Sequence, residues 1–173
     1  YPEAKMTTLI NFMNDINFRE VTMRKKIKLL CCLLITKETG VFINQLSKNG
    51  FDVRLVTSNP CSTNIQVVNE LEEMGVHVYW IKDDDDKKYF ELLKKSLEFR
   101  PDYIIDDGGD LVDAAHQMNM QEIKGCCEET TSGLIKEKRL ALEKKLCFPI
   151  IAVNNAKTKN LMENHNFPKR HSF

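Results

Sequence analysis

Apolar segments of strand length alternate with segments of helical periodicity along most of the chain. The longest apolar stretch, residues 27–35, fits a strand that is buried on both faces. The pattern predicts strands over residues 27–35, 53–56, 76–81, 103–105 and 150–153, with helices in the intervals between them. Strand and helix therefore alternate, which is typical of an α/β domain. We expect three layers, with a Rossmann-like, mostly parallel sheet flanked by helices.

Glycines and short polar segments indicate where the helices begin and end. Gly50 and Gly75 each follow a helical pattern and are good terminators. Ser62 or Thr63 is expected to cap the second helix. The acidic segment 83–86 precedes the third helix, where it would solvate the loop and complement the positive end of the helix. A cation site in that segment is the alternative.

The length and the charge narrow the class of protein. A chain of 173 residues fits one domain, here residues 1–173, with residues 1–24 as a helical N-terminal extension. The 25 basic and 25 acidic side chains balance, so we expect no general attraction to nucleic acid or to anionic lipid. No apolar run approaches the ~20 residues that span a bilayer, and no leader pattern is present. We expect a cytoplasmic protein.

The cysteines favour free thiols over disulfides or metal ligation. Six are present, as two adjacent pairs and two single residues: Cys31-Cys32, Cys126-Cys127, Cys61 and Cys147. Adjacent cysteines are poor partners for a disulfide framework, and no Cys-x-x-Cys accompanies a metal-binding histidine pair. We expect buried free thiols in a reducing compartment, and no metal site.

Carboxylates and glycines follow the strand predicted at 103–105. The segment 106–110 reads Asp-Asp-Gly-Gly-Asp, which places three carboxylates within five residues. Ligands of parallel α/β sheets bind beyond the carboxyl ends of the strands, and glycines let a ligand approach the backbone. Two alternatives stay open: Asp110 caps the next helix, or the carboxylates hold magnesium, although no phosphate-binding loop accompanies them.

Two further polar segments belong to the same predicted edge of the sheet. Residues 128–133 supply two carboxylates and three hydroxyls at the start of the helix expected over about 133–145. After the strand at 150–153, Lys159 and Glu163 lie four residues apart, on one face if that segment is helical; a surface ion pair is the alternative. The residues alone predict a polar site for hydroxyl-rich small molecules. The four histidines are expected to be structural or exposed: His77, His116, His165 and His171.

Taken together, these segments resemble the substrate-binding domain of the S-adenosylhomocysteine hydrolase (adenosylhomocysteinase) family. The family's Asp-Asp-Gly-Gly-Asp-Leu is matched by residues 106–111, and its Glu-Glu-Thr-Thr-Thr-Gly by residues 128–133, with Ser132 as the third hydroxyl. Its Val-Asn-Asp-Ser-x-x-Lys-x-x-x-Asp-Asn resembles residues 153–164, and its Asn-Pro-Leu-Ser-Thr-Gln turn resembles residues 59–64. Order and spacing are preserved over most of residues 27–164.

The resemblance implies a reaction and a set of roles. In the family, a tightly bound NAD oxidises the ribose 3′-hydroxyl, the neighbouring C4′ proton becomes acidic, homocysteine leaves, water adds and the ketone is reduced again. Asp107 and Glu129 would lie near the ribose and the proton transfers, with Lys159 assisting deprotonation of the 3′-hydroxyl and Glu163 beside it. Residues matching those that hold the adenine are Thr36 and Glu38; residues matching those that reach NAD are Thr130, Thr131, Ser132 and Asn164.

The chain also departs from the family pattern. Leu34 replaces a histidine that partners the Asp107 position, and Asn64 replaces a glutamine. Glu163 replaces an aspartate; the extra methylene can move the carboxylate by ~1 Å, and such a shift can cost ~100-fold in rate. Residues 165–173 form a divergent tail, and the 173 residues contain no match to the family's NAD-binding domain.

These departures lead to three hypotheses. The first is a substrate domain that binds adenosine or S-adenosylhomocysteine but does not perform NAD-dependent hydrolysis alone. The second is a noncatalytic regulatory or interaction protein that kept the fold. The third is one half of a split S-adenosylhomocysteine hydrolase, completed by a separate subunit that supplies the NAD-binding domain.

Overall fold

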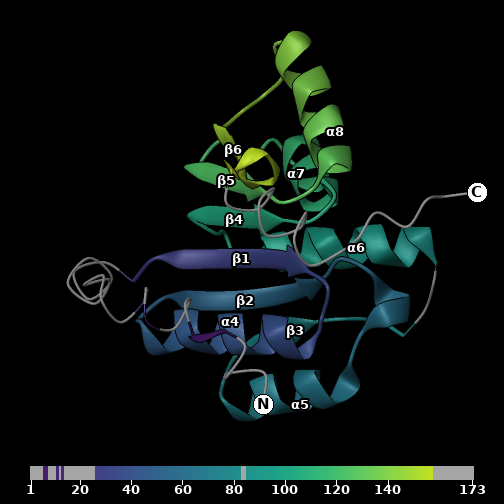
Figure 1. Cartoon of the computed structure of the whole chain (residues 1–173). Coiled ribbons are helices and arrows are strands. Elements are labelled where there is room, and N and C mark those ends of the chain that lie inside the picture. Colours follow the sequence, from purple (N-terminus) through teal and green to yellow (C-terminus); the bar gives the residue numbers. More distant parts are fainter. Residues whose placement is uncertain (1–5, 8–10, 12, 14–25, 83–84, 158–173) are drawn as a thin grey trace, which may run out of the picture.

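The computed structural model describes residues 6–7, 11, 13, 26–82 and 85–157, and this part forms a six-stranded parallel sheet with helices on both faces (Figure 1). The strands lie in the order β3-β2-β1-β4-β5-β6. They are β1 (Lys28–Leu33), β2 (Asp52–Thr57), β3 (His77–Tyr79), β4 (Tyr103–Asp106), β5 (Gly125–Glu128) and β6 (Ile150–Ala152). Every described strand pair is parallel, so the predicted α/β class with three layers is confirmed.

In the described part, five helices and one short 3₁₀ turn connect the strands, and a second 3₁₀ turn follows β6. The helices are α4 (Lys37–Lys48), α5 (Ile65–Glu73), α6 (Asp86–Leu97), α7 (Asp110–Gln117) and α8 (Thr131–Leu142); the turns are η1 (Pro60–Ser62) and η2 (Val153–Asn155). The strand order reverses between β1 and β4, which are neighbours in the sheet but are separated by two other strands in the chain. In such sheets a crevice opens at this reversal, beyond the carboxyl ends of the two strands.

The sequence of β1 explains why this strand lies inside the sheet. Leu30 and Cys32 pack into the core under α6 and α7, whereas Leu29, Cys31 and Leu33 pack into the core under α4 and α5. Because side chains alternate across a strand, an unbroken apolar run supplies both cores at once. The long apolar stretch at the start of the described chain therefore becomes the centre of the three-layer structure.

The helix ends were predicted in part. Gly50 and Gly75 adopt positive φ angles of 90° and 83°, as expected of glycines that end helices. Asp85 caps α6 by accepting bonds from the backbone amides of residues 87 and 88. The predicted cap of α5 was wrong: Asn64 is the cap, whereas Ser62 lies in η1 and Thr63 bonds to another hydroxyl instead.

In the region from 103 to 128, one strand was not predicted, and one of the alternatives left open for Asp110 is ruled out. The sequence pattern did not indicate β5, because Gly125–Glu128 offers only two cysteines as apolar residues and ends in a glutamate. Asp110 does not cap α7; Gly109 occupies that position with a φ of 76°, and Asp110 forms an ion pair with Lys136 at 2.5 Å. The tertiary pairing of β5 between β4 and β6 overrides its weak strand pattern.

Most of the predicted N-terminal extension (1–24) and all of the tail (165–173) lie outside the described residues. Within the extension, Thr7, Asn11 and Met13 are helical, and Met13 is buried in the core under α4 and α5. No helix in the described part of the chain combines the length and the apolar character needed to cross a membrane.

The structure shows how far each cysteine thiol is buried and what the His116 side chain contacts. All six cysteines are free, and Cys31, Cys32 and Cys126 are buried as expected, but Cys61 is exposed, which corrects its prediction as a buried thiol. His116 packs against Phe148, and one ring nitrogen lies 2.7 Å from a backbone carbonyl of its own helix while the other accepts a bond from a backbone amide 31 residues away. His116 therefore holds α7 against the segment before β6, as the sequence predicted for a structural histidine.

Candidate functional site

A cavity of about 850 Å³ lies at the carboxyl edge of the sheet, beside the reversal between β1 and β4. It is lined by residues at the carboxyl ends of β1, β4 and β5, by residues that follow β1, β4, β5 and β6, by α4 and by one N-terminal residue. The lining residues are Met6, Leu33, Leu34, Thr36, Glu38, Thr39, Phe42, Ile105, Asp107, Cys127, Glu129, Thr130, Val153 and Ala156. Five of the predicted site residues thus lie on one cavity although they come from distant parts of the chain.

Asp107 and Glu129, the predicted catalytic pair within the described part, follow two adjacent strands. Asp107 comes directly after β4 and Glu129 directly after β5, and the parallel register pairs Asp106 with Glu128 just before them. Ser58, at the end of β2, donates a hydrogen bond to Asp107 Oδ2 at 3.1 Å. Asp107 is half-buried and Glu129 is exposed. The pair therefore presents two carboxylates to the cavity at different depths.

Thr36 and Glu38 lie on the other side of the reversal, at the start of α4. Thr36 is the N-cap of α4, and its hydroxyl accepts a bond from the backbone amide of Thr39 at 3.2 Å. Glu38 is exposed in the first turn of the same helix, where a carboxylate is favoured by the helix dipole. Leu34, which departs from the pattern that the sequence resembles, lines the cavity with an apolar side chain that is 40% exposed.

Two buried carboxylates, Asp106 and Glu128, directly precede Asp107 and Glu129 in the chain. Asp106 is fully buried; its Oδ1 accepts from the Asp107 amide at 2.9 Å and its Oδ2 from the Val112 amide at 2.8 Å. Burial raises the pKa of Asp106 to about 7, and the neighbouring charge of Glu128 acts in the same direction. The Asp106 carboxylate thereby fixes the backbone on which Asp107 is carried.

Glu128 performs the same task for the next strand. Its Oε1 accepts three bonds, from the Gly108 amide at 3.1 Å, the Thr130 amide at 2.7 Å and the Thr130 hydroxyl at 2.6 Å. Its Oε2 is buried without a hydrogen-bond partner in the described structure. A Cβ at Gly133 would lie 2.2 Å from Glu128 Cδ, so the first turn of α8 packs on this carboxyl group only because residue 133 is glycine.

Glu137 adds a third buried carboxyl group, which the sequence analysis did not identify. It lies one turn along α8 from Gly133, and neither of its carboxyl oxygens has a hydrogen-bond partner within the described part. Burial raises the pKa of Glu137 to about 8, with the charges of Glu128 and Asp106 acting in the same direction. Its place three residues after the buried Leu134 is the helical spacing that could have indicated an inward-facing side chain.

The three predicted NAD-contacting hydroxyls have different environments. Thr130 is the N-cap of α8 and accepts from the Gly133 amide at 3.0 Å, so its hydroxyl is already engaged by the fold. Thr131 accepts a bond from the Asn154 side-chain amide at 2.8 Å, which ties the turn after β6 to the start of α8. Thr131 and Ser132 are exposed.

The remaining predicted residues, Lys159, Glu163 and Asn164, lie outside the described residues, so their roles stay predictions.

The sequence did not predict two residues that contribute to the site, Ser58 and Phe42. Ser58 stands immediately before the family-like Asn-Pro turn, which was the available signal. There was no reason in the sequence to single out Phe42, because α4 contains several apolar residues and nothing distinguishes this one. In the described part, no group of three or more His, Cys, Asp or Glu residues could hold a metal ion.

The fold is a doubly wound α/β domain with a cavity at the carboxyl edge of its sheet, the position where such domains bind their ligands. Residues 2–122 match the family described as S-adenosyl-L-homocysteine hydrolase. The chain belongs to this family.

Individual relatives agree with this assignment. The chain is 41% identical over 139 residues to adenosylhomocysteinase of Sulfolobus acidocaldarius, an alignment covering 80% of this chain and 34% of the relative. It is 37% identical over 150 residues to adenosylhomocysteinase of Pyrococcus abyssi, covering 85% and 36%. It is 35% identical over 159 residues to S-inosyl-L-homocysteine hydrolase of Methanocaldococcus jannaschii, covering 90% and 38%. The chain thus spans about a third of the length of the curated relatives it matches.

Proposed function

We propose that the cavity binds a purine riboside, as the nucleoside part of an S-adenosylhomocysteine-like substrate. The observation that carries the proposal is that one cavity collects Thr36, Glu38, Asp107 and Glu129 from the ends of three strands. Its volume of about 850 Å³ lies within the ~300–1,000 Å³ common for small-molecule sites. Membership of the family, whose relatives act on adenosyl- and inosyl-homocysteine by name, supports the same class of ligand.

The chemistry of the lining fits the two parts of a nucleoside. Leu33, Leu34 and Phe42 provide apolar surface against which a flat base can be buried. Asp107 and Glu129 provide carboxylate oxygens, which accept bonds from ribose hydroxyls and form charge-assisted hydrogen bonds. Ser58 already occupies Asp107 Oδ2, so it orients this carboxylate and leaves Oδ1 for the ligand.

For the chemical step we propose that Asp107 and Glu129 accept and return protons, with Lys159 assisting at the 3′-hydroxyl and Glu163 beside it. When bound, NAD would accept the hydride from the ribose carbon that carries the 3′-hydroxyl. The hydroxyls of Thr131 and Ser132 are exposed and accessible to a cofactor, and we propose that they contact NAD together with Thr130 and Asn164. We therefore propose that the 173 residues bind nucleoside but do not complete hydrolysis by themselves.

Calorimetric titration with adenosine, inosine and S-adenosylhomocysteine tests the proposal. We expect saturable binding that Asp107→Asn and Glu129→Gln each weaken at least ~10-fold, because each substitution removes a charge-assisted hydrogen bond. Glu122→Gln, an exposed carboxylate after α7, is the matched control and should bind as the wild type does. Equal affinity in the Asp107 variant would contradict the site. Absence of heat at millimolar ligand would favour the regulatory or interaction protein.

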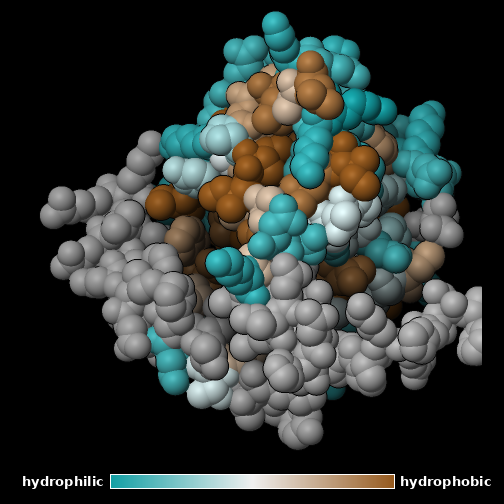
Figure 2. Space-filling model, turned by 45° about the horizontal axis from the view of Figure 1, so that its top comes forward, coloured by the Kyte–Doolittle hydropathy of each residue, from teal (hydrophilic) through white to brown (hydrophobic). Residues whose placement is uncertain are grey.

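A second candidate, the half of a split hydrolase, is favoured by apolar surface around β6. Ile151 is 65% exposed, Leu142 is 85% exposed and Val153 is 37% exposed, and apolar side chains gather on this face over β6 and α8 (Figure 2). Release of homocysteine from S-adenosylhomocysteine should then require NAD together with an added subunit that carries an NAD-binding domain. Hydrolysis by this chain with NAD alone would contradict both candidates.

A further inference from the structure

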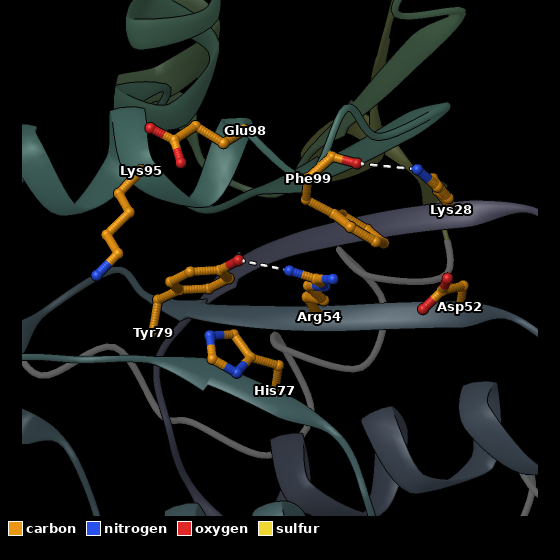
Figure 3. Close-up of a pocket in the computed structure, with 8 residues that line it drawn as sticks. All are labelled: Lys28, Asp52, Arg54, His77, Tyr79, Lys95, Glu98 and Phe99. Atoms are coloured by element: carbon orange, nitrogen blue, oxygen red, sulfur yellow. Dashed lines mark hydrogen bonds between the residues drawn. The ribbon is translucent and has the colours of Figure 1, made fainter.

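A second cavity, of about 460 Å³, lies at the opposite edge of the sheet from the nucleoside site (Figure 3). It is formed by the first residues of β1 and β2, by both ends of the short strand β3, and by the last turn of α6 with the two residues that follow this helix. The lining residues are Lys28, Asp52, Arg54, His77, Tyr79, Lys95, Glu98 and Phe99. None of them lines the first cavity, so the two sites are separate surfaces of one domain.

Arg54 is held in place at the centre of this cavity. Its Nη1 donates a hydrogen bond of 2.8 Å to the hydroxyl of Tyr79, and its guanidinium lies 4.1 Å from the centroid of the Phe99 ring. Tyr79 and Phe99 are themselves buried, so both supports are rigid. Within the described structure the other two guanidinium nitrogens make no hydrogen bond. A preorganised guanidinium with free donors loses little conformational entropy when it binds an anion.

A second cation shares the same aromatic ring. Lys28 Nζ lies 5.1 Å from the Phe99 centroid and donates to the Phe99 carbonyl at 3.2 Å. Neither Lys28 nor Arg54 forms an ion pair with a carboxylate among the residues that the structure describes. Asp52, the nearest acidic residue in sequence, pairs instead with Lys26 at 3.8 Å. Two half-buried cations thus lie against one aromatic ring, and the two carboxylates of the same cavity, Asp52 and Glu98, form no ion pair with either of them in the described part.

We propose that this cavity binds a phosphate group, as free phosphate or as a phosphate monoester. Arg54 offers the planar donors that match a phosphate, and Lys28 adds a point charge beside them. Lys95 contributes a third positive charge at the rim, against the two carboxylates Asp52 and Glu98. An anion bound by the Arg54 guanidinium beside the Phe99 ring would reduce the repulsion between Arg54 and Lys28, which is strongest where water is partly excluded.

Titration with inorganic phosphate and with phenyl phosphate, followed by calorimetry at constant ionic strength with chloride as the reference, tests the site. We expect saturable binding in the millimolar range or tighter, weakened at least ~10-fold by Arg54→Met and by Lys28→Met. Lys87→Met, an exposed lysine at the other end of α6, is the matched control and should leave affinity unchanged. Asp52→Asn should tighten binding because it removes a competing negative charge.

The proposal would be overturned if no binding were detected at phosphate concentrations ~50-fold above ~1 mM, or if Arg54→Met bound phosphate as tightly as the wild type. It would also be overturned if Lys87→Met lost as much affinity as Arg54→Met, because the attraction would then be nonspecific. If Arg54→Met fails to fold, Arg54→Lys keeps the charge and should still weaken binding by losing the planar donors. Tighter binding of phenyl phosphate than of free phosphate would identify a monoester as the preferred ligand. Adenosine affinity should be the same in all these variants, so failure here is distinguishable from failure of the proposed function.

Discussion

The backbone amide of Gly108 donates a hydrogen bond of 3.1 Å to Oε1 of Glu128, across 20 residues of sequence. This bond joins the turn after β4, which carries Asp107, to the turn after β5, which carries Glu129. The same oxygen accepts two bonds from Thr130, so one buried carboxylate fixes both turns and the cap of α8. The spacing between the Asp107 and Glu129 side chains is therefore fixed by Glu128, a buried residue that does not line the cavity.

Replacing Glu128 by alanine should lower the free energy of unfolding by about 2–4 kcal/mol, because the half-buried amide donors of Gly108 and Thr130 lose their acceptor. Urea unfolding followed by circular dichroism measures the loss. Glu122→Ala, at an exposed position, should change stability by less than ~0.5 kcal/mol. A Glu128 variant as stable as this control would show that the carboxylate does not hold the turns together.

Gly133→Ala should destabilise the protein by more than ~2 kcal/mol, although alanine is the better helix former by ~1 kcal/mol. The added Cβ would lie 2.2 Å from Cδ of Glu128, whose side chain is fully buried and cannot move aside. Thermal unfolding checks this expectation. Ser132→Ala, one residue earlier and exposed, is the control and should stay near the wild-type midpoint. A stabilised Gly133 variant would contradict the close packing of α8 on Glu128.

Stability should fall as the pH rises from about 4 to about 8. Burial raises the pKa of Asp106 to about 7 and that of Glu137 to about 8, whereas carboxyl groups in an unfolded chain ionise near ~4. The native state thus binds more protons over this window, and the free energy of unfolding decreases with pH.

Glu137→Gln should flatten this dependence and raise stability at pH 8 by ~1 kcal/mol or more, since a shift of one unit corresponds to ~1.4 kcal/mol. Urea midpoints measured at pH 5, 6, 7 and 8 provide the comparison. Glu122→Gln should follow the wild-type curve. If the Glu137 variant also follows the wild-type curve, Glu137 does not titrate in this window.

The thiols should differ sharply in reactivity toward a thiol reagent such as dithionitrobenzoate. Cys61 is exposed and should react at once in the native protein. Cys31 and Cys126 are buried, and burial raises the pKa of both thiols, which suppresses the reactive thiolate until the protein unfolds. Cys127 and Cys147 are half-buried and should react more slowly than Cys61, so the fastest phase should disappear in Cys61→Ser. A fast phase that survives this substitution would place another thiol at the surface.

Local patterns were sufficient for most of the fold. The apolar run that becomes β1 predicted a strand buried on both faces, and glycines 50 and 75 predicted helix ends that the structure confirms. β5 was missed because a segment of four residues, two of them cysteines, carries little strand preference of its own. Its pairing with both neighbours supplies the stability that its composition lacks.

By itself, the sequence determined the alternation of strands and helices, the family motifs and the identity of five residues that line one cavity, because these depend on residue type, order and spacing. Only the tertiary structure decided that Asp106, Glu128 and Glu137 gather beneath the site, and that Arg54 and Lys28 meet on the ring of Phe99 at the opposite edge. Such juxtapositions arise from parallel strands that are distant in the chain, and no local pattern encodes the distance between them.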